Sequence, residues 1–404
     1  MHLWKKLEHM TRKDFIKAFT LLGISIPFQS VLASCSSDDG TPVENNFNGK
    51  VIIIGAGPAG MASAYLLAQQ GIDFEILEAA PTYGGRIKHN TTFADFPLPL
   101  GAEWLHVART ELPAIVNDNS VNITTVTQGY QGSDVVGYFE NGEYNTYSLS
   151  NWGSFIDQKF IGSSWLDFFE TYIVPSIQSK FVFNKEVTEI NYQDTNVTLT
   201  TNDGEEYVAD KVIVAVPLKV LQNNRINFTP ALSNSKQQAI QNAPIWGGFK
   251  AFIEFSNKFY PTFLEFADGE TAAGQRLYYD AAYGQNSTKN ILGLFSVGQQ
   301  AEQYQNVSGN AQRDYMLNEL DAVFNGAATQ NYVDHIVQNW NDEPFIGAAY
   351  LADNASSNIS SVLSTSINNK VYFAGDAYTQ EDDWSAVHNA ARSARDAVRE
   401  LLVN

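Results

Sequence analysis

One stretch near residue 50 constrains the fold more than any other part of the chain. It begins with Val51-Ile52-Ile53-Ile54, a run of β-branched side chains typical of a strand buried on both faces. A glycine-rich turn follows at once and leads into a helical pattern, after which a second strand over 74–77 ends at Glu78. Strand, glycine turn, helix and strand in this order predict the first unit of a Rossmann-like parallel sheet.

The glycine-rich turn predicts a dinucleotide site. Gly55 permits the tight turn, Gly57 lets the backbone approach a pyrophosphate, and Gly60 lets the helix pack closely on the strand. The free amide groups at the helix start would face the phosphate charge, and Glu78 can accept hydrogen bonds from a ribose diol. The residues that we predict to contact the dinucleotide here are Gly55, Ala56, Gly57, Pro58, Ala59, Gly60, Glu78 and Ala79.

The segment after the second strand distinguishes FAD from NAD. It reads Pro81-Thr82-Tyr83-Gly84-Gly85-Arg86-Ile87, with a glycine pair and an arginine. At this point the chain resembles the flavin amine oxidase family, which includes monoamine and polyamine oxidases. The resemblance implies that the segment wraps the FAD pyrophosphate, with Gly85 and Arg86 against it; the alternative is a surface turn with a solvated arginine. An NAD-dependent dehydrogenase would leave this segment without a use.

Further blocks resemble the same family in the same order. The block 100–106 resembles the stretch beside the isoalloxazine ring, and 212–218 resembles the strand and turn beside the ribityl chain. In the block 371–376, Asp376 replaces the commoner Glu and is implied to hold ribityl or pyrophosphate oxygens. The positive end of the last helix is implied to face the flavin pyrimidine. The FAD contacts that these blocks imply are Gly101, Ala102, Glu103, Trp104, Val187, Val216, Trp340, Gly375, Asp376, Trp384, Ser385, Ala386 and Val387.

The expected fold class is therefore α/β. A Rossmann-like FAD-binding domain, formed by a parallel sheet with a β-meander, is interrupted by an α+β substrate-binding domain. Alternation over 180–215 with a turn at Asn202-Asp203-Gly204 would supply the meander. Aromatic residues at helical spacing near 165–172 follow no motif and are more often core than tunnel wall. We assign 49–104, 180–228 and 344–404 to the FAD-binding domain, and 105–179 and 229–343 to the substrate-binding domain.

Lys250 is the candidate catalytic residue. It follows Gly247-Gly248-Phe249 and matches the family lysine that holds a water near flavin N5. The alternative is a solvated lysine at the edge of a half-buried strand. The resemblance implies hydride transfer from the amine α-carbon to N5, reoxidation by O2 to give H2O2, and an imine that hydrolyses to an aldehyde.

The residues expected to bind substrate favour polyamines. His106, which follows Trp104 and Leu105, resembles the polyamine oxidase branch, where a histidine faces the amine tunnel; the alternative is a histidine packed in its loop. Tyr350 matches one wall of the aromatic cage of monoamine oxidases, but Val387 stands at the facing position, so a full cage is absent. The expected substrate contacts are His106, Tyr350 and Trp104. Ala349 stands where monoamine oxidases carry the flavin-linked cysteine, so the FAD is expected to be non-covalent.

Rival functions remain open. Within the same fold they are an L-amino acid oxidase, for which Arg109 could clasp a carboxylate, and a desaturase, which would not need Lys250. From another class comes a lipid-anchored protein that binds flavin or transfers electrons without oxidase turnover. Peroxide release with an amine separates these classes.

The N-terminus and the net charge indicate location and partners. A formal charge of −19 argues against nucleic-acid binding and suits cationic small molecules. Residues 1–35 read as an export signal ending in Leu32-Ala33-Ser34-Cys35, which resembles a bacterial lipoprotein signal with a lipidated Cys35; an incidental thiol after an ordinary signal is the alternative. Residues 36–48 read as a tether. We expect an exported protein, anchored to a membrane only through that lipid, on the periplasmic face or the cell surface. No metal-ligand spacing occurs, and the oligomeric state stays open.

Overall fold

The structure is a computed structural model that describes residues 45–404, except 119, 154–156, 353–354 and 380–384. The predicted export signal, Cys35, most of the predicted tether and Trp384 lie outside the described residues.

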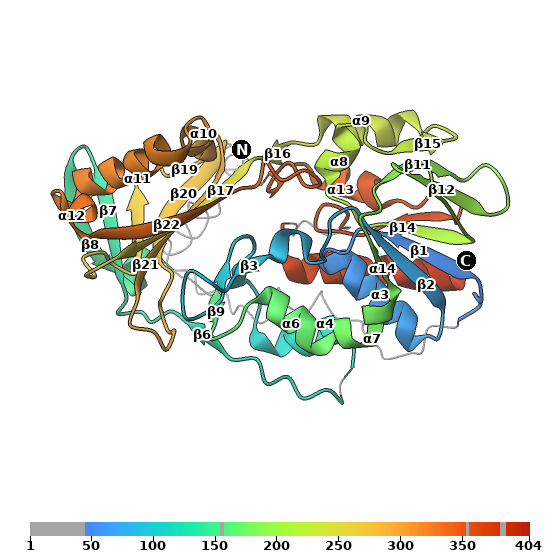
Figure 1. The fold of residues 1–404 in the computed structure, drawn as a ribbon, viewed down its shortest axis with the longest axis horizontal. Helices are drawn as coiled ribbons and strands as arrows, with labels where there is room; N and C mark the ends of the chain where they lie inside the picture. The colour runs from blue at the N-terminus through green and yellow to red at the C-terminus, as the bar shows by residue number, and fades with distance from the viewer. Residues whose placement is uncertain (1–44, 119, 154–156, 353–354, 380–384) are drawn as a thin grey trace, which may run out of the picture.

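A five-stranded parallel sheet forms the centre of one half of the molecule, at the right of Figure 1. Its strand order is β10-β2-β1-β14-β24, and every neighbouring pair runs parallel. The strands predicted over 51–54, over 74–77 and around 212–216 are three of these five, so these predictions are confirmed. The strands are β1 (Lys50–Ile54), β2 (Asp73–Glu78), β10 (Phe181–Phe183), β14 (Lys211–Val214) and β24 (Val371–Phe373).

One face of this sheet is covered by helices. Val51 and Ile53 of β1 point to this face, and they share a buried core with the helices that flank it (Figure 1). The core also takes in the aromatic residues Trp165, Phe168 and Phe169, so the expectation that they are core residues is confirmed. The helices are α3 (Pro58–Gln69), α4 (Leu112–Val116), α6 (Trp165–Tyr172), α7 (Val174–Ile177) and α14 (Val387–Val403).

The other face is covered by a second, four-stranded sheet of order β13-β12-β11-β15. Because side chains alternate along a strand, Ile52 and Ile54 of β1 point to this face and join a separate core. The predicted turn carries Gly204 at a φ of 82° between two of the strands. The elements on this side are β11 (Val187–Asn191), β12 (Val197–Thr201), β13 (Glu206–Ala209), β15 (Asn227–Thr229), α8 (Leu218–Gln222), α9 (Asn234–Asn242) and α13 (Ser357–Ser364).

An eight-stranded, mostly antiparallel sheet dominates the other half of the molecule (Figure 1). Its central path has the order β22-β17-β21-β20-β18-β7-β8, and β19 pairs with β20 beside it. Three helices from 299–331 accompany it. The elements are β7 (Val135–Glu140), β8 (Glu143–Ser148), α5 (Leu149–Trp152), β17 (Gly248–Phe255), β18 (Phe263–Phe266), β19 (Glu270–Thr271), β20 (Gly274–Asp280), β21 (Asn290–Gly298), α10 (Gln299–Gln305), α11 (Gly309–Phe324), α12 (Ala327–Asn331) and β22 (Tyr332–Asn339).

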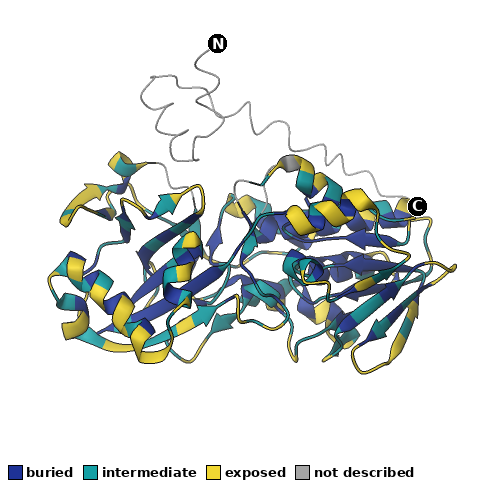
Figure 2. Ribbon diagram, turned by 90° about the horizontal axis from the view of Figure 1, so that it is seen from above, coloured by how far each residue is buried: buried dark blue, intermediate teal, exposed yellow. Residues whose placement is uncertain are grey.

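Three small sheets lie between the two halves and bring distant segments together. Figure 2 shows buried residues running along the strands of both large sheets on either side of them. The boundaries that we assigned to the two domains stay a prediction. The small sheets pair β3 (His89–Asn90) with β4 (Leu98–Pro99), pair β16 (Ile245–Trp246) with β23 (Tyr350–Leu351), and order β5 (Trp104–Leu105), β9 (Gln158–Phe160) and β6 (Thr127–Gly129) as β5-β9-β6. Short 3-10 turns occupy Gly85–Ile87, Arg109–Glu111 and Gln178–Lys180.

Candidate functional site

The predicted glycine turn joins β1 to α3. Gly55 has a φ of 101°, a conformation that favours glycine. A Cβ on Gly60 would lie 1.9 Å from the Gly55 carbonyl oxygen, which is why the helix can start so close to the strand. A Cβ on Gly57 would meet nothing within 4 Å, so the backbone there is open on one side. Gly57 caps α3 without a side-chain hydrogen bond, and this geometry fits a pyrophosphate against the first amide groups of the helix.

Glu78 at the end of β2 holds this turn in place. One carboxylate oxygen accepts a hydrogen bond from the Ala56 amide at 2.6 Å, and the other accepts one from the Ala80 amide at 2.8 Å. Burial raises the pKa of Glu78, although these backbone bonds and Lys88 act the other way. Each carboxylate oxygen can accept a second hydrogen bond, so the expected ribose contact fits.

The second glycine-rich segment lies directly against the first turn. The Gly84 amide donates to the Ala56 carbonyl at 2.9 Å, and a Cβ on Gly85 would lie 3.2 Å from the Gly57 Cα. Gly84 and Gly85 both have a positive φ, 115° and 54°. Two loops that are separate in the sequence therefore form one cradle lined by backbone, which suits a flat or phosphorylated ligand.

Arg86 links the cradle to the C-terminal part of the chain. Its guanidinium faces the Asp376 carboxylate in a two-pronged ion pair, with contacts of 2.5 and 3.1 Å, and it also donates to the Ala349 carbonyl. Arg86, Asp376 and Ala349 line a pocket of about 250 Å³. We predicted separate cofactor contacts for Arg86 and Asp376, and the structure brings the two side chains together.

The segment 99–103 lies on the other side of Arg86. The Ala102 amide donates to the Arg86 carbonyl at 3.0 Å, and a Cβ on Gly101 would lie 1.9 Å from that same carbonyl oxygen. The indole of Trp340 closes over this segment and donates to the Leu100 carbonyl at 3.0 Å. Gly101, Ala102 and Trp340, predicted from distant blocks, are thus neighbours.

Lys250 on β17 is buried, with 3% of its surface exposed, and its ammonium points into this segment. It donates to the carbonyls of Pro99 and Gly101 at 2.9 and 3.1 Å and to the Glu103 carboxylate at 2.7 Å. A solvated lysine at a strand edge is therefore excluded. The predicted lysine lies against the same backbone that lines the cradle.

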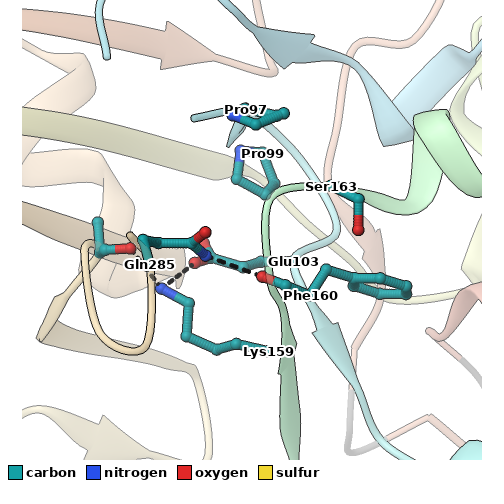
Figure 3. Close-up of a pocket in the computed structure, with 8 residues that line it drawn as sticks. Pro97, Pro99, Glu103, Lys159, Phe160, Ser163 and Gln285 are labelled. Carbon is teal, nitrogen blue, oxygen red and sulfur yellow. Dashed lines mark hydrogen bonds and ion pairs between the residues drawn. The ribbon is translucent and has the colours of Figure 1, made fainter. Parts of the chain in front are cut away.

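Glu103 was predicted as a cofactor contact, and the structure turns its side chain towards two lysines. Besides Lys250, the ammonium of Lys159 on β9 lies 3.2 Å from the carboxylate, and the hydroxyl of Tyr279 on β20 donates to it. Glu103 and Lys159 line one small pocket, which Figure 3 shows. Neither Lys159 nor Tyr279 was predicted, because neither belongs to a recognisable motif.

The three predicted substrate residues lie in two places: Trp104 on β5 with His106 directly after it, and Tyr350 on β23. Trp104 stacks edge-on with Tyr279 at 4.8 Å between ring centroids, and its indole donates to the Tyr130 hydroxyl at 3.0 Å. His106 is partly exposed, and its Nδ1 lies 3.0 Å from Asp157, a partner that the sequence did not indicate. The Tyr350 ring lies beside Trp246, 6.2 Å between centroids.

The remaining predicted contacts frame the site. Val187 is buried in β11 at a bulge, and the Val216 carbonyl accepts from the Tyr378 hydroxyl at 3.1 Å. The Gly375 amide donates to Ser393 of α14 at 2.9 Å. Ser385 bonds the Leu351 carbonyl at 2.9 Å, and Ala386 and Val387 begin α14. Trp384 is not among the described residues.

Two classes of feature are not found in the described part of the chain. No helix there is both long and apolar enough to cross a membrane. Within the same residues, His, Cys, Asp and Glu side chains do not gather in a group that could hold a metal ion.

Comparison with known families matches two parts of the chain. Residues 170–402 match the family described as flavin containing amine oxidoreductase. Residues 53–118 match the NAD(P)-binding Rossmann-like domain. The first match covers more than half of the chain.

Individual relatives and solved structures are similar along most of this chain. Polyamine oxidase 4 of Oryza sativa subsp. japonica is 24% identical over 85% of this chain and 86% of that protein. Lysine-specific histone demethylase 2 of Homo sapiens is 24% identical over 92% of this chain, which spans about half (54%) of that protein. A putrescine oxidase solved with putrescine has a TM-score of 0.73 at 15% identity and covers 89% of this chain and 100% of its own. Cyclohexylamine oxidase from Brevibacterium oxydans IH-35A has a TM-score of 0.70 at 16% identity, over 88% of this chain and 99% of its own.

Proposed function

This chain belongs to the flavin containing amine oxidoreductase family, and on that premise we propose that it is an FAD-dependent oxidase of primary or secondary amines, with polyamines as the favoured substrates. For a primary amine, the overall reaction converts the amine, O2 and water into an aldehyde, ammonia and H2O2. Bound FAD supplies the two-electron oxidation of the C–N bond and passes those electrons to O2. The residues of the chain position both ligands and control the protons.

The observation that carries the proposal is the position of Lys250. Its ammonium donates to the carbonyls of Pro99 and Gly101, and Gly101 lies against the Arg86 carbonyl in the cradle. A buried lysine at the wall of a cofactor cradle can transfer a proton there, away from bulk solvent, and a water that it held would replace one of its three present acceptors, because an ammonium has three N–H donors. A protein that only stored flavin would not need to bury this ammonium.

The cradle supports FAD as the ligand. The backbone amides at the start of α3 and that of Gly85 would hold the pyrophosphate, and Glu78 would accept from the ribose. Arg86 and Asp376 would flank the ribityl and pyrophosphate oxygens. Ala349 offers no thiol at the position where a covalent link would form, so the FAD would be held by non-covalent contacts alone.

Three observations support a polyamine as the substrate. His106 and Asp157 form a polar pair two residues along the strands from Trp104 and Lys159, where a second nitrogen of a longer amine could be received. The formal charge of −19 attracts cations. Two of the compared proteins, a polyamine oxidase and a putrescine oxidase, are named for such substrates.

Peroxide release with a panel of amines tests the proposal. Spermidine and putrescine should give peroxide faster than benzylamine or an L-amino acid. Preference for an L-amino acid would redirect the assignment to an amino acid oxidase, and flavin binding without peroxide from any amine would favour an electron-transfer protein.

Replacement of Lys250 by Met tests the role of its ammonium. Lys250→Met should retain FAD and lower turnover by at least about 100-fold, the scale of a lost proton-transfer group. Lys236→Met is the matched control, because Lys236 is also a buried lysine but contacts carbonyls at the end of α13, and it should retain turnover. Equal turnover in both variants would remove Lys250 from the mechanism.

We also propose that the protein is exported and anchored through a lipid on Cys35. Support comes from the sequence alone, in the basic start, the apolar stretch and the Leu32-Ala33-Ser34-Cys35 ending. Mass spectrometry of the N-terminal peptide from a membrane fraction should find a lipidated Cys35, and Cys35→Ser should release the protein. An unmodified peptide starting elsewhere would contradict the proposal.

A further inference from the structure

The carboxylate of Glu103 has two differently occupied sides. Oε2 accepts hydrogen bonds from the Lys250 ammonium at 2.7 Å and from the Tyr279 hydroxyl. Oε1 lies 3.2 Å from the Lys159 ammonium, and among the described residues it has no hydrogen-bond partner. Glu103 therefore stands between the two lysines and contacts both.

Three different parts of the fold supply these groups. Lys250 comes from the eight-stranded sheet, Lys159 from the small sheet β5-β9-β6, and Glu103 from the segment that lines the cradle. Lys159 is fixed further by the carbonyls of Ala281 and Asp280, at 2.6 and 3.4 Å. Each charged group of the cluster is thus fixed by a different part of the fold.

The charges of this cluster do not balance. Glu103, Lys159 and Lys250 are 4%, 3% and 3% exposed, so none can rely on water for stabilisation. One carboxylate can neutralise only one ammonium, and the second leaves an excess positive charge. Burial of a charge without a full partner is costly, so the second ammonium beside Glu103 disfavours the charged form of Lys250.

The direction of the pKa changes agrees with this geometry. Burial lowers the pKa of Lys250, Glu103 opposes that change, and Lys159 adds to it. For Glu103, burial alone would raise the pKa, but the two lysines hold it below its ordinary value.

Other ionisable groups around Lys250 do not correct the imbalance. Desolvation raises the pKa values of the buried Tyr279 and the partly buried Tyr130 well above their usual range, and so both phenols stay neutral. Two further pairs of charges on the neighbouring elements are opposite in sign, Lys258 with Asp280 at 2.6 Å and Lys88 with Glu343 at 3.1 Å. Gln338, which faces Lys250 across the sheet from β22, is neutral.

We propose that Glu103 and Lys159 are positioning residues that act through Lys250 in opposite directions: Glu103 holds the Lys250 ammonium charged and in place, and Lys159 opposes that charge. The proposal rests on the proposed function for its catalytic meaning. The pocket in Figure 3 is lined by Glu103 and Lys159, so the Glu103 carboxylate contacts Lys250 and also lies at the wall of this pocket.

The pH dependence of turnover tests the proposal with opposed variants. In a plot of turnover against pH, the informative limb is the rise or fall that is present in the wild type and disappears in Lys250→Met. Lys159→Met should move that limb to higher pH, because a repelling charge is removed, and Glu103→Gln should move it to lower pH, because an attracting charge is removed. Lys159→Arg keeps the charge and should leave the limb where it is. A purely structural role would lower turnover at every pH without moving the limb.

The pH dependence of stability provides a readout that does not need activity. With a folded-state pKa below the unfolded value, Lys250 makes the free energy of unfolding rise with pH through the window between the two. Lys159→Met should reduce that slope relative to Lys159→Arg, and Glu103→Gln should steepen it relative to wild type. If Glu103→Gln does not fold, the Lys159 pair decides alone.

The two readouts separate the two proposals. Absence of amine turnover would defeat the proposed function, and the stability slopes would still judge this inference. The inference would be overturned if turnover were normal and neither the pH limb of turnover nor the pH slope of the free energy of unfolding moved in Lys159→Met and Glu103→Gln. A shift in the same direction in both variants would also overturn it. Either result would leave the proposed function standing.

Discussion

The two large sheets contribute to the site by different means. At the parallel sheet, the backbone does the work: glycines let two loops and a helix start approach within contact distance, and few side chains take part. The eight-stranded sheet instead contributes a side chain, the buried Lys250, whose ammonium contacts the Glu103 carboxylate from another part of the fold, and that carboxylate also contacts Lys159. A site made from backbone requires glycine at fixed positions, so it can be recognised as a local pattern in the sequence. A site made from side chains that converge from distant segments leaves no such pattern.

The glycine turn offers the largest expected effect and a control within the same turn. Gly60→Ala forces a Cβ onto the Gly55 carbonyl, and we expect it to cost about 3 kcal/mol of stability or more. Gly57→Ala meets no protein atom, so the FAD-free protein should change by less than about 1 kcal/mol, while FAD affinity falls because the ligand needs that space. Urea unfolding and FAD titration of both variants measure the two effects, and equal stability losses would contradict the account.

Arg86 is the charged side chain that links the backbone cradle to the C-terminal part of the chain. Arg86→Ala removes the partner of Asp376 and the bond to Ala349, and we expect FAD affinity to fall by roughly 10-fold, about the value of one charge-assisted hydrogen bond. Arg86→Lys keeps the charge but not the two-pronged geometry, and it should fall between Ala and wild type. Full FAD loading of Arg86→Ala after dialysis would show that the pair does not support the cofactor.

A buried lysine on the parallel-sheet side sharpens the comparison with Lys250. Lys236 donates to the Leu363 carbonyl at 2.9 Å and contacts the Phe373 ring, and burial lowers its pKa to about 7, although the Glu400 carboxylate acts the other way. The unfolded chain then holds more protons between this value and 10.5, so the free energy of unfolding should rise with pH across that window. In Lys236→Met, the part of the rise in the free energy of unfolding that comes from Lys236 should disappear. An unchanged slope would mean that Lys236 stays protonated in the folded protein.

The sequence predicted the parallel-sheet side well because its constraints are local. The run at 51–54 is buried on both faces and so is apolar throughout, and Gly55, Gly57 and Gly60 follow within six residues. Lys250 was also found, although only through its resemblance to a family lysine.

The partners of that lysine could not be predicted. Lys159 meets Glu103 because β9 pairs with β5, and that register joins residues more than 50 positions apart. The pair of Arg86 with Asp376, and that of His106 with Asp157, depend in the same way on long-range packing. Glu103 was predicted as a cofactor contact from its neighbours in the sequence, and its ion pairs with Lys159 and Lys250 depend on long-range packing in the same way.

An anaerobic visible spectrum of the purified, FAD-loaded protein, before and after addition of spermidine, tests the central claim most directly. The account predicts a flavin spectrum that bleaches when spermidine is added and returns when air is admitted, with peroxide formed. Failure to take up flavin at all, even with added FAD, would contradict it.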